Sequence, residues 1–271
     1  MRTRELAIRS MVSAVLTAAM ACAVSLPAYG QRPDVVYVAT PHETVERMLR
    51  LADVRSSDFV IDLGSGDGRI PIAAARRGAR ALGIEIDPDR IREAEANARS
   101  AGVTNRVRFR QEDLFKTPLA EATVITMYLL PELNARLSPR LLALQPGTRI
   151  VSHLFPMADW KPDATDTDGG AIYLWIVPAQ VTGRWQVQHG DGVFTVEFAQ
   201  RYQEISGIAR LAGGTTAVRD GRLHGGSIEF TVDIDGKPAR FRGIVDGSRM
   251  ETAPAGVSFG PRMEAWSASR M

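Results

Sequence analysis

The chain has 271 residues, of which 45% are hydrophobic and 24% charged, a composition ordinary for a soluble globular protein with a sizeable core. Residues 1–30 hold three of the 33 basic residues and one of the 31 acidic residues, so the remainder of the chain is neutral. A neutral body excludes the broad basic surface typical of nucleic-acid binding. The only cysteine, Cys22, lies within residues 1–30. If residues 1–30 are removed, the remaining chain can form no disulfide and has no cysteine for a zinc site or for nucleophilic catalysis.

The first thirty residues have the pattern of a signal peptide. An arginine-containing start, residues 1–10, precedes an apolar, alanine-rich stretch over 11–26, and small residues at 28 and 30 offer a cleavage site before Gln31. Left uncleaved, the stretch would be a membrane anchor, although about 16 residues is shorter than the roughly 20 that span a bilayer. A mitochondrial presequence and a true start codon further downstream are the two other interpretations. We expect a bacterial protein that is exported, periplasmic or anchored, and cytoplasmic only if the leader is a mis-assigned start.

A helix with a clear start is predicted directly after the leader region. Thr40 is placed as its N-cap, Pro41 as its first helical residue, and Glu43 as the partner that completes a capping box. The apolar residues between Val45 and Ala52 then recur on one helical face.

Strands and helices alternate from there to about residue 177. The patterns predict strands over 58–63, 79–86, 107–111, 122–128, 148–153 and 171–177, helices over 67–77, 87–101 and 131–144, and a loop over 156–170. Pro139 is expected to interrupt the last of these helices. This alternation favours an α/β fold with a doubly wound, mostly parallel sheet, and we assign residues 31–180 to it.

The pattern changes at about residue 181. Four Asp-Gly pairs, at 191, 220, 235 and 246, are strong tight-turn signals, and alternating apolar runs at 193–199, 227–234 and 239–245 lie between them. Residues 181–271 are therefore predicted to form a small antiparallel β meander. The sequence leaves the role of this region and the oligomeric state open.

The most informative stretch is Val60–Ile70, VIDLGSGDGRI, in which glycines stand at 64, 66 and 68 between a predicted strand and a predicted helix. This context favours a nucleotide-like ligand at the carboxyl end of the strand. A dinucleotide fingerprint would need glycine at position 69, where Arg69 stands. Asp62 would repel a pyrophosphate and attract an ammonium group.

Two more carboxylates follow the next two predicted strands. Glu85 is placed to accept the hydroxyls of a ribose, and Asp113 is placed to accept from an adenine amino group. An amino-acid end, a ribose and an adenine together describe S-adenosylmethionine (SAM). The cofactor contacts are expected at Asp62, Gly64, Ser65, Gly66, Asp67, Gly68, Glu85, Ile86, Asp113 and Leu114.

With these motifs, residues 56–115 resemble a class I SAM-dependent methyltransferase. Four stretches resemble more specifically the family that methylates a lysine of the ATP synthase ring protein and of the adenine nucleotide translocase, with its bacterial relatives. They are Tyr37–Pro41 (YVATP), Asp62–Ile70 (DLGSGDGRI), Asp113–Lys116 (DLFK) and Tyr128–Pro131 (YLLP), and Phe155-Pro156 with Trp160 fits more loosely. The resemblance covers roughly residues 35–178 and departs from the family pattern at Ala39, where proline is usual.

The resemblance implies methyl transfer to an amine, with a protein lysine favoured over a small molecule as the acceptor. Many methyltransferases that act on nucleobase amines carry an acid or amide followed by two prolines where this chain has Tyr128–Pro131. The Tyr37–Pro41 segment is expected to close over SAM, and Tyr128 to line the acceptor slot, so Tyr128 and Tyr37 are the candidate catalytic residues.

Two further expectations concern the histidines and the alternative function. His153 ends an apolar strand, where a histidine is more often structural than catalytic, and the four histidines show no ligand spacing, so no metal is expected. SAM is made in the cytosol, so an exported chain raises a second hypothesis. In it, the fold is a non-catalytic scaffold that binds its partner through the β-rich C-terminal region.

Overall fold

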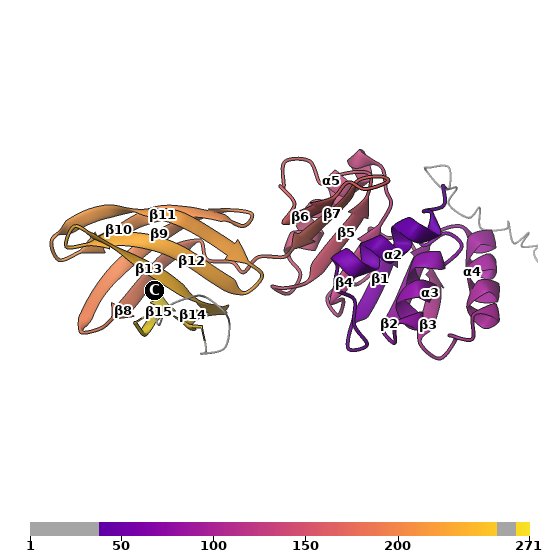
Figure 1. Ribbon diagram of the computed structural model, residues 1–271, viewed down its shortest axis with the longest axis horizontal. Coiled ribbons are helices and arrows are strands. Elements are labelled where there is room, and N and C mark those ends of the chain that lie inside the picture. Colours follow the sequence, from indigo (N-terminus) through magenta and orange to yellow (C-terminus); the bar gives the residue numbers. More distant parts are fainter. Residues whose placement is uncertain (1–37, 254–263) are drawn as a thin grey trace, which may run out of the picture. The chain divides into compact units, whose positions relative to one another are not determined.

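The computed structural model describes residues 38–253 and 264–271, so the expected leader and Tyr37 lie outside the described residues. The described chain forms two sheets, one open with seven strands and one closed into a barrel (Figure 1). No helix within the described ranges is both long and apolar enough to cross a membrane.

The open sheet confirms the predicted α/β class. Its strands are β1 (Phe59–Leu63), β2 (Arg80–Glu85), β3 (Val107–Gln111), β4 (Val124–Met127), β5 (Arg149–His153), β6 (Ala164–Asp166) and β7 (Ile172–Ile176), in the order β3-β2-β1-β4-β5-β7-β6. Strands β1 to β5 pair in parallel, and β7 runs antiparallel to both of its neighbours. The strand order reverses between β1 and β4, which is the place where doubly wound sheets bind ligands at the carboxyl ends of the strands.

Helices cover both faces of this sheet. Helices α2 (His42–Leu51), α3 (Arg69–Arg76) and α4 (Pro88–Ser100) supply side chains to one hydrophobic core (Figure 1), and α5 (Pro131–Leu142) supplies them to the other. Pro139 does not interrupt α5, contrary to the sequence expectation. Proline removes one backbone hydrogen bond, but Leu137 and Leu141 on either side of it are fully buried and hold the helix on the sheet.

The segment between β5 and β6 has no helix. Met157 and Trp160 from this segment are buried at 0% and 1% exposure and cover the sheet face that a helix would otherwise cover. The predicted loop over 156–170 is wrong at Ala164–Asp166, because β6 forms there. Three residues are too few for a periodic pattern to indicate a strand.

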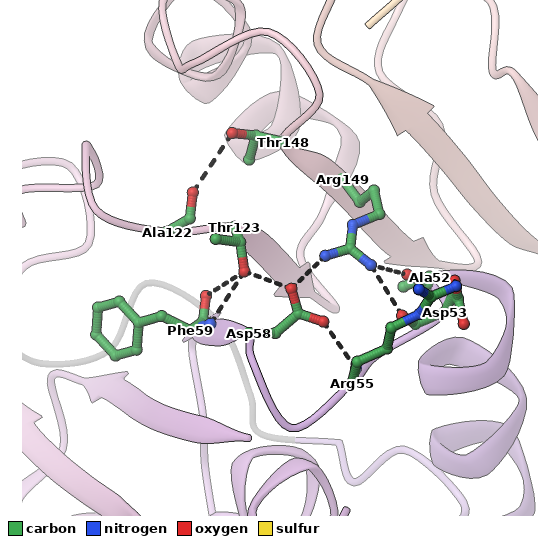
Figure 2. Close-up of polar contacts among 9 residues, drawn as sticks. All are labelled: Ala52, Asp53, Arg55, Asp58, Phe59, Ala122, Thr123, Thr148 and Arg149. Carbon is green, nitrogen blue, oxygen red and sulfur yellow. Dashed lines mark hydrogen bonds and ion pairs between the residues drawn. The ribbon is translucent and has the colours of Figure 1, made fainter. Parts of the chain in front are cut away.

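A polar network joins elements at the amino-terminal edge of the parallel strands (Figure 2). The buried carboxylate of Asp58 accepts from the Thr123 hydroxyl at 2.8 Å and from the Arg55 backbone N–H at 2.7 Å, and it also pairs with the Arg149 guanidinium. Arg149 donates in addition to the carbonyl of Ala52 at 2.7 Å, at the end of α2. The starts of β1, β4 and β5 and the end of α2 are thereby joined.

The C-terminal strands confirm the predicted antiparallel meander and close it into a barrel. They are β8 (Gly183–His189), β9 (Gly192–Arg201), β10 (Glu204–Leu211), β11 (Gly214–His224), β12 (Ser227–Ile234), β13 (Lys237–Asp246), β14 (Arg249–Thr252) and β15 (Trp266–Arg270). Strand β15 pairs with β8, which closes the barrel. Aromatic side chains fill the interior, among them Trp185, Phe230, Phe241 and Trp266, all at most 4% exposed.

Three of the four Asp-Gly pairs lie at strand connections, as predicted. Asp235 and Gly236 have φ of 51° and 77° and form the two-residue turn between β12 and β13. The pair Asp220-Gly221 lies inside β11 instead, where the pairing register shifts, so it forms a bulge and the turn prediction is wrong there. A Cβ on Gly221 would lie 2.2 Å from the carbonyl oxygen of Ile205, so the bulge requires glycine.

Candidate cofactor and acceptor site

The glycine loop connects β1 to α3 at the carboxyl edge of the open sheet. Gly64, Gly66 and Gly68 have φ of 78°, 50° and 81°, a region that favours glycine. The backbone N–H groups of Gly64 and Ser65 both donate to the Ile84 carbonyl at 2.9 Å, which ties the loop to β2. A Cβ on Gly68 would lie 2.7 Å from the Phe109 ring, so this glycine also allows the close packing of the loop on β3.

Glu85, the predicted ribose acceptor, lies at the end of β2 and holds the loop in place. Its carboxylate accepts from the backbone N–H of Gly66 at 2.9 Å, of Ile86 at 2.8 Å and of Asp87 at 3.0 Å. A carboxylate has about four acceptor positions, so capacity remains for a ligand hydroxyl. The structure therefore places Ile86 with Glu85 and the glycine loop, as the sequence predicted for one site.

Asp62 lies on β1 beneath the loop and is 1% exposed. The Thr126 hydroxyl on β4 donates to it at 2.6 Å. The pKa of Asp62 is raised to about 7, chiefly by burial; the Thr126 hydrogen bond lowers it, and the charges of Glu85 and Asp67 add to the rise. A cation that binds beside Asp62 would favour its ionised form.

Asp67 and Arg69 join the glycine loop to the residues that precede α2. The Arg69 guanidinium donates to the Asp67 carboxylate through Nε at 2.9 Å and Nη2 at 2.6 Å, and to the Thr40 carbonyl through Nη1 at 2.8 Å. The arginine that breaks the dinucleotide fingerprint thus has a structural role.

Asp113 and Leu114 follow β3 at the same edge. The Asp113 carboxylate accepts from the Phe115 backbone N–H at 2.9 Å, while the Glu112 N–H donates to the Glu85 carbonyl at 3.0 Å. Leu114 packs against the hydrophobic core that contains α5. These bonds bring the predicted adenine-binding turn beside the predicted ribose acid.

The residues of this edge fit SAM on two structural grounds. The Ser65 hydroxyl is buried in the loop and has no hydrogen-bond partner among the residues that the structure describes. The loop backbone carries no side chains at three positions, and a buried acid, Asp62, lies beneath it. Bound SAM would be held by Asp62, the loop, Glu85 and Asp113. No cluster of three metal-binding side chains occurs within residues 38–253 and 264–271.

A second group of side chains lies where β4 and β5 end. The rings of Tyr128 and His153 are 4.3 Å apart between centroids, and the Phe155 ring stacks with that of Tyr128 at 6.1 Å. Burial lowers the pKa of His153, and the charge of Arg47 lowers it further, which favours the neutral imidazole. Arg47 is itself paired with Asp166 at 2.6 Å.

The structure changes the interpretation of two residues here. Thr40 does not cap α2, because Pro41 holds the N-cap position and no side chain makes the capping hydrogen bond. The Thr40 hydroxyl lies instead 3.5 Å from Nδ1 of His153. The structural role that the sequence favours for His153 stays a prediction. The register pairs Met127 with Ser152, so the next residues, Tyr128 and His153, meet at the sheet edge. The proximity of Tyr128 and His153 follows from this strand register, which local sequence patterns do not reveal.

Comparison with known proteins identifies the family. A model of the ANTKMT methyltransferase domain matches residues 62–164. A protein-lysine N-methyltransferase of Saccharolobus islandicus is 44% identical over 153 residues, which cover 54% of this chain and 95% of the relative. The chain belongs to the family of protein-lysine N-methyltransferases. The family model ends before β8, the first strand of the barrel.

Another relative of this methyltransferase shares only part of its length with it. The mouse adenine nucleotide translocase lysine N-methyltransferase is 37% identical over 140 residues, which cover 51% of this chain and 61% of the relative.

A solved structure supports the cofactor. An RNA methyltransferase from Salinibacter ruber, crystallised with S-adenosyl-L-homocysteine, is 54% identical with a TM-score of 0.52 and covers 53% of this chain and 96% of that chain. The protein is thus a SAM-dependent methyltransferase, and the comparisons support the enzyme and not the non-catalytic scaffold.

Proposed function

We propose that this methyltransferase transfers the methyl group of SAM to the ε-amine of a protein lysine, and that Tyr128 and His153 line the acceptor slot. The observation that carries the proposal is the Tyr128–His153 pair, 4.3 Å apart at the ends of β4 and β5, next to the glycine loop. The names of the relatives from Saccharolobus islandicus and mouse support lysine as the acceptor.

In methyl transfer the protein has two main tasks, to position the acceptor amine and to remove its proton. Bound SAM supplies an electrophilic methyl group, and the acceptor nitrogen must present a lone pair in line with it. Free lysine has a pKa of about 10.4, so the slot must favour the neutral amine. An imidazole whose Nδ1–H donates to the Thr40 hydroxyl leaves Nε2 of His153 as an acceptor for the departing proton. The Tyr128 ring packs against His153 and fixes its orientation.

RNA is the second candidate acceptor, because the Salinibacter ruber structure is titled an RNA methyltransferase. Two features favour protein. The chain beyond residue 30 is neutral, and Tyr128–Pro131 lacks the acid or amide and the paired prolines found at many nucleobase sites. A small-molecule amine is the third candidate acceptor.

Radiolabelled methyl transfer distinguishes these acceptors. Residues 31–271 are incubated with methyl-labelled SAM and a fractionated lysate of the source cells, and the products are treated with protease or ribonuclease. Label that is released only by protease, and that mass spectrometry places on lysine, supports the proposal. Label released only by ribonuclease, or recovered only in small molecules, overturns it. A His153→Ala variant serves as the control for background transfer.

We also propose that residues 1–30 direct the protein to export or anchor it in a membrane. The arginine-containing start and the apolar stretch over 11–26 support this proposal. Mass spectrometry of the N-terminus from fractionated cells tests it. A mature start at Gln31, or an intact leader in the membrane fraction, supports export or anchoring, whereas an internal start in the cytosol contradicts both.

A further inference from the structure

Three large apolar side chains close in sequence to Tyr128, His153 and Thr40 are exposed to solvent. Val38, Leu130 and Leu154 are 60%, 39% and 38% exposed, and they are the only exposed large hydrophobic residues that the structure describes between 38 and 182. We call these three residues the apolar rim. Single exposed apolar residues are common on proteins, so the significance of these three depends on where they lie.

Two members of the apolar rim are within two residues of the proposed slot, and the third is within two residues of Thr40. Leu154 follows His153, Leu130 lies two residues beyond Tyr128, and Val38 lies two residues before Thr40, whose hydroxyl is 3.5 Å from His153. Consecutive Cα atoms are about 3.8 Å apart, so the backbones of Leu130 and Leu154 lie within about 8 Å of Tyr128 and His153, and that of Val38 lies within about 8 Å of Thr40. A lysine that reaches Tyr128 and His153 would therefore pass near the backbone of the rim.

The conformation of Leu154 is a second, independent observation. Its φ is 62°, a region that bulky residues rarely adopt. The conformation is held by the Leu154 N–H, which donates to the Ala171 carbonyl at 2.8 Å. Strained backbone of this kind concentrates at functional sites, and here it accompanies an exposed leucine beside His153.

We propose that the apolar rim selects acceptor lysines that are flanked by apolar residues. This inference rests on the proposed function and names the class of lysine that the site takes. The occupant is the polypeptide segment that carries the acceptor lysine, because a chain whose lysine reaches Tyr128 and His153 must cross the rim. Arg47, whose charge lowers the pKa of His153, is paired with Asp166. This pair therefore has no excess positive charge that would attract acidic residues on either side of the acceptor lysine. Apolar contact would also exclude water from the slot and favour the neutral amine.

The test compares two synthetic peptides of equal length and charge, each with one lysine. In one peptide leucine and valine flank the lysine, and in the other serine and glutamine do. We expect residues 31–271 to methylate the apolar peptide with a kcat/KM about tenfold higher than that for the polar peptide, mainly because of a lower KM. In Leu130→Ser/Leu154→Asn the preference should fall to about twofold or less. Asparagine is chosen at 154 because it tolerates positive φ.

Two controls keep the outcome interpretable. Ile208→Ser removes an exposed apolar side chain from the barrel and should leave the preference unchanged. The dissociation constant for S-adenosylhomocysteine and the Tm of each variant report whether the cofactor site and the fold are intact. Equal turnover of both peptides by the wild type overturns the selection and leaves lysine methylation standing. Turnover of neither peptide, together with labelled RNA or small molecules from the lysate, contradicts the proposed function as well. A preference that persists in the rim variant also overturns the inference.

Discussion

The Asp62 carboxylate on β1 accepts a 2.6 Å hydrogen bond from the Thr126 hydroxyl on β4, at a place where Asp62 is 1% exposed. A single neutral donor does not offset the cost of burying a charge, which is why the pKa of Asp62 rises to about 7. The ionised form of Asp62, a predicted cofactor residue, is thus destabilising in the folded protein without a ligand.

The first prediction concerns this cost. Between the ordinary pKa of 3.8 and about 7, the folded protein keeps a proton that the unfolded chain has released. The free energy of unfolding without cofactor should therefore fall as the pH rises through that window. Asp62→Asn should remove this pH dependence and raise stability at pH 8, by up to about 4 kcal/mol, because asparagine still accepts from Thr126. Urea unfolding from pH 4 to 8 measures both effects.

The same carboxylate should make cofactor binding depend on pH. S-adenosylhomocysteine carries an ammonium group that pairs with ionised Asp62, so its affinity should rise between pH 6 and pH 8. Calorimetric titration measures this, and Asp62→Asn should bind too weakly to detect. Tight, pH-independent binding by that variant would remove Asp62 from the cofactor site.

A second prediction concerns His153. His153→Gln should lower kcat by about 100-fold near neutral pH, since a general base contributes typically that much, and should leave the dissociation constant of S-adenosylhomocysteine unchanged. Burial lowers the pKa of His153, so at saturating SAM the acid limb of the wild-type kcat should lie below pH 6.5 and should be missing in the variant. An unaltered limb would assign it to another group.

The third prediction concerns Tyr128. Tyr128→Phe keeps the ring contact with His153 and removes only the hydroxyl, so transfer should slow by about tenfold while cofactor binding stays intact. Tyr128→Ala also removes the ring and should reduce kcat further. Single-turnover kinetics with a saturating acceptor peptide compare the two variants. Normal turnover by Tyr128→Phe would show that the hydroxyl has no part in the reaction.

The fourth prediction concerns the amino-terminal edge of the sheet. Asp58→Asn leaves the Arg149 guanidinium without its buried counter-charge and should destabilise the protein by about 2–4 kcal/mol. The specific activity of the folded fraction should stay within about twofold, because the network lies opposite the site. Arg55→Ala is the matched control: its side chain is 71% exposed, so removing it should cost little. Comparable loss in both variants would contradict the assigned role of Asp58.

Sequence patterns predicted what depends on local periodicity. The strand over Val107–Gln111 has the predicted bounds, and the predicted cofactor residues of β1, β2 and β3 meet at one edge because parallel strands end together. Long-range pairing was beyond these patterns. The β4–β5 register, which makes His153 a neighbour of Tyr128, and the β15–β8 closure depend on residues far apart in the chain. The turn prediction failed at Asp220-Gly221, because an Asp-Gly pair can form a β-bulge as well as a tight turn.

Closure of the barrel by β15 has a consequence for biosynthesis. The open sheet has all of its strands once residue 176 has left the ribosome, whereas the barrel needs Trp266–Arg270 before β8 gains its second neighbour. Until then β8 and β14 each present an unpaired strand edge, and such edges associate with other chains. A chain released before Trp266–Arg270 is translated would thus carry a completed methyltransferase sheet attached to an open, aggregation-prone barrel.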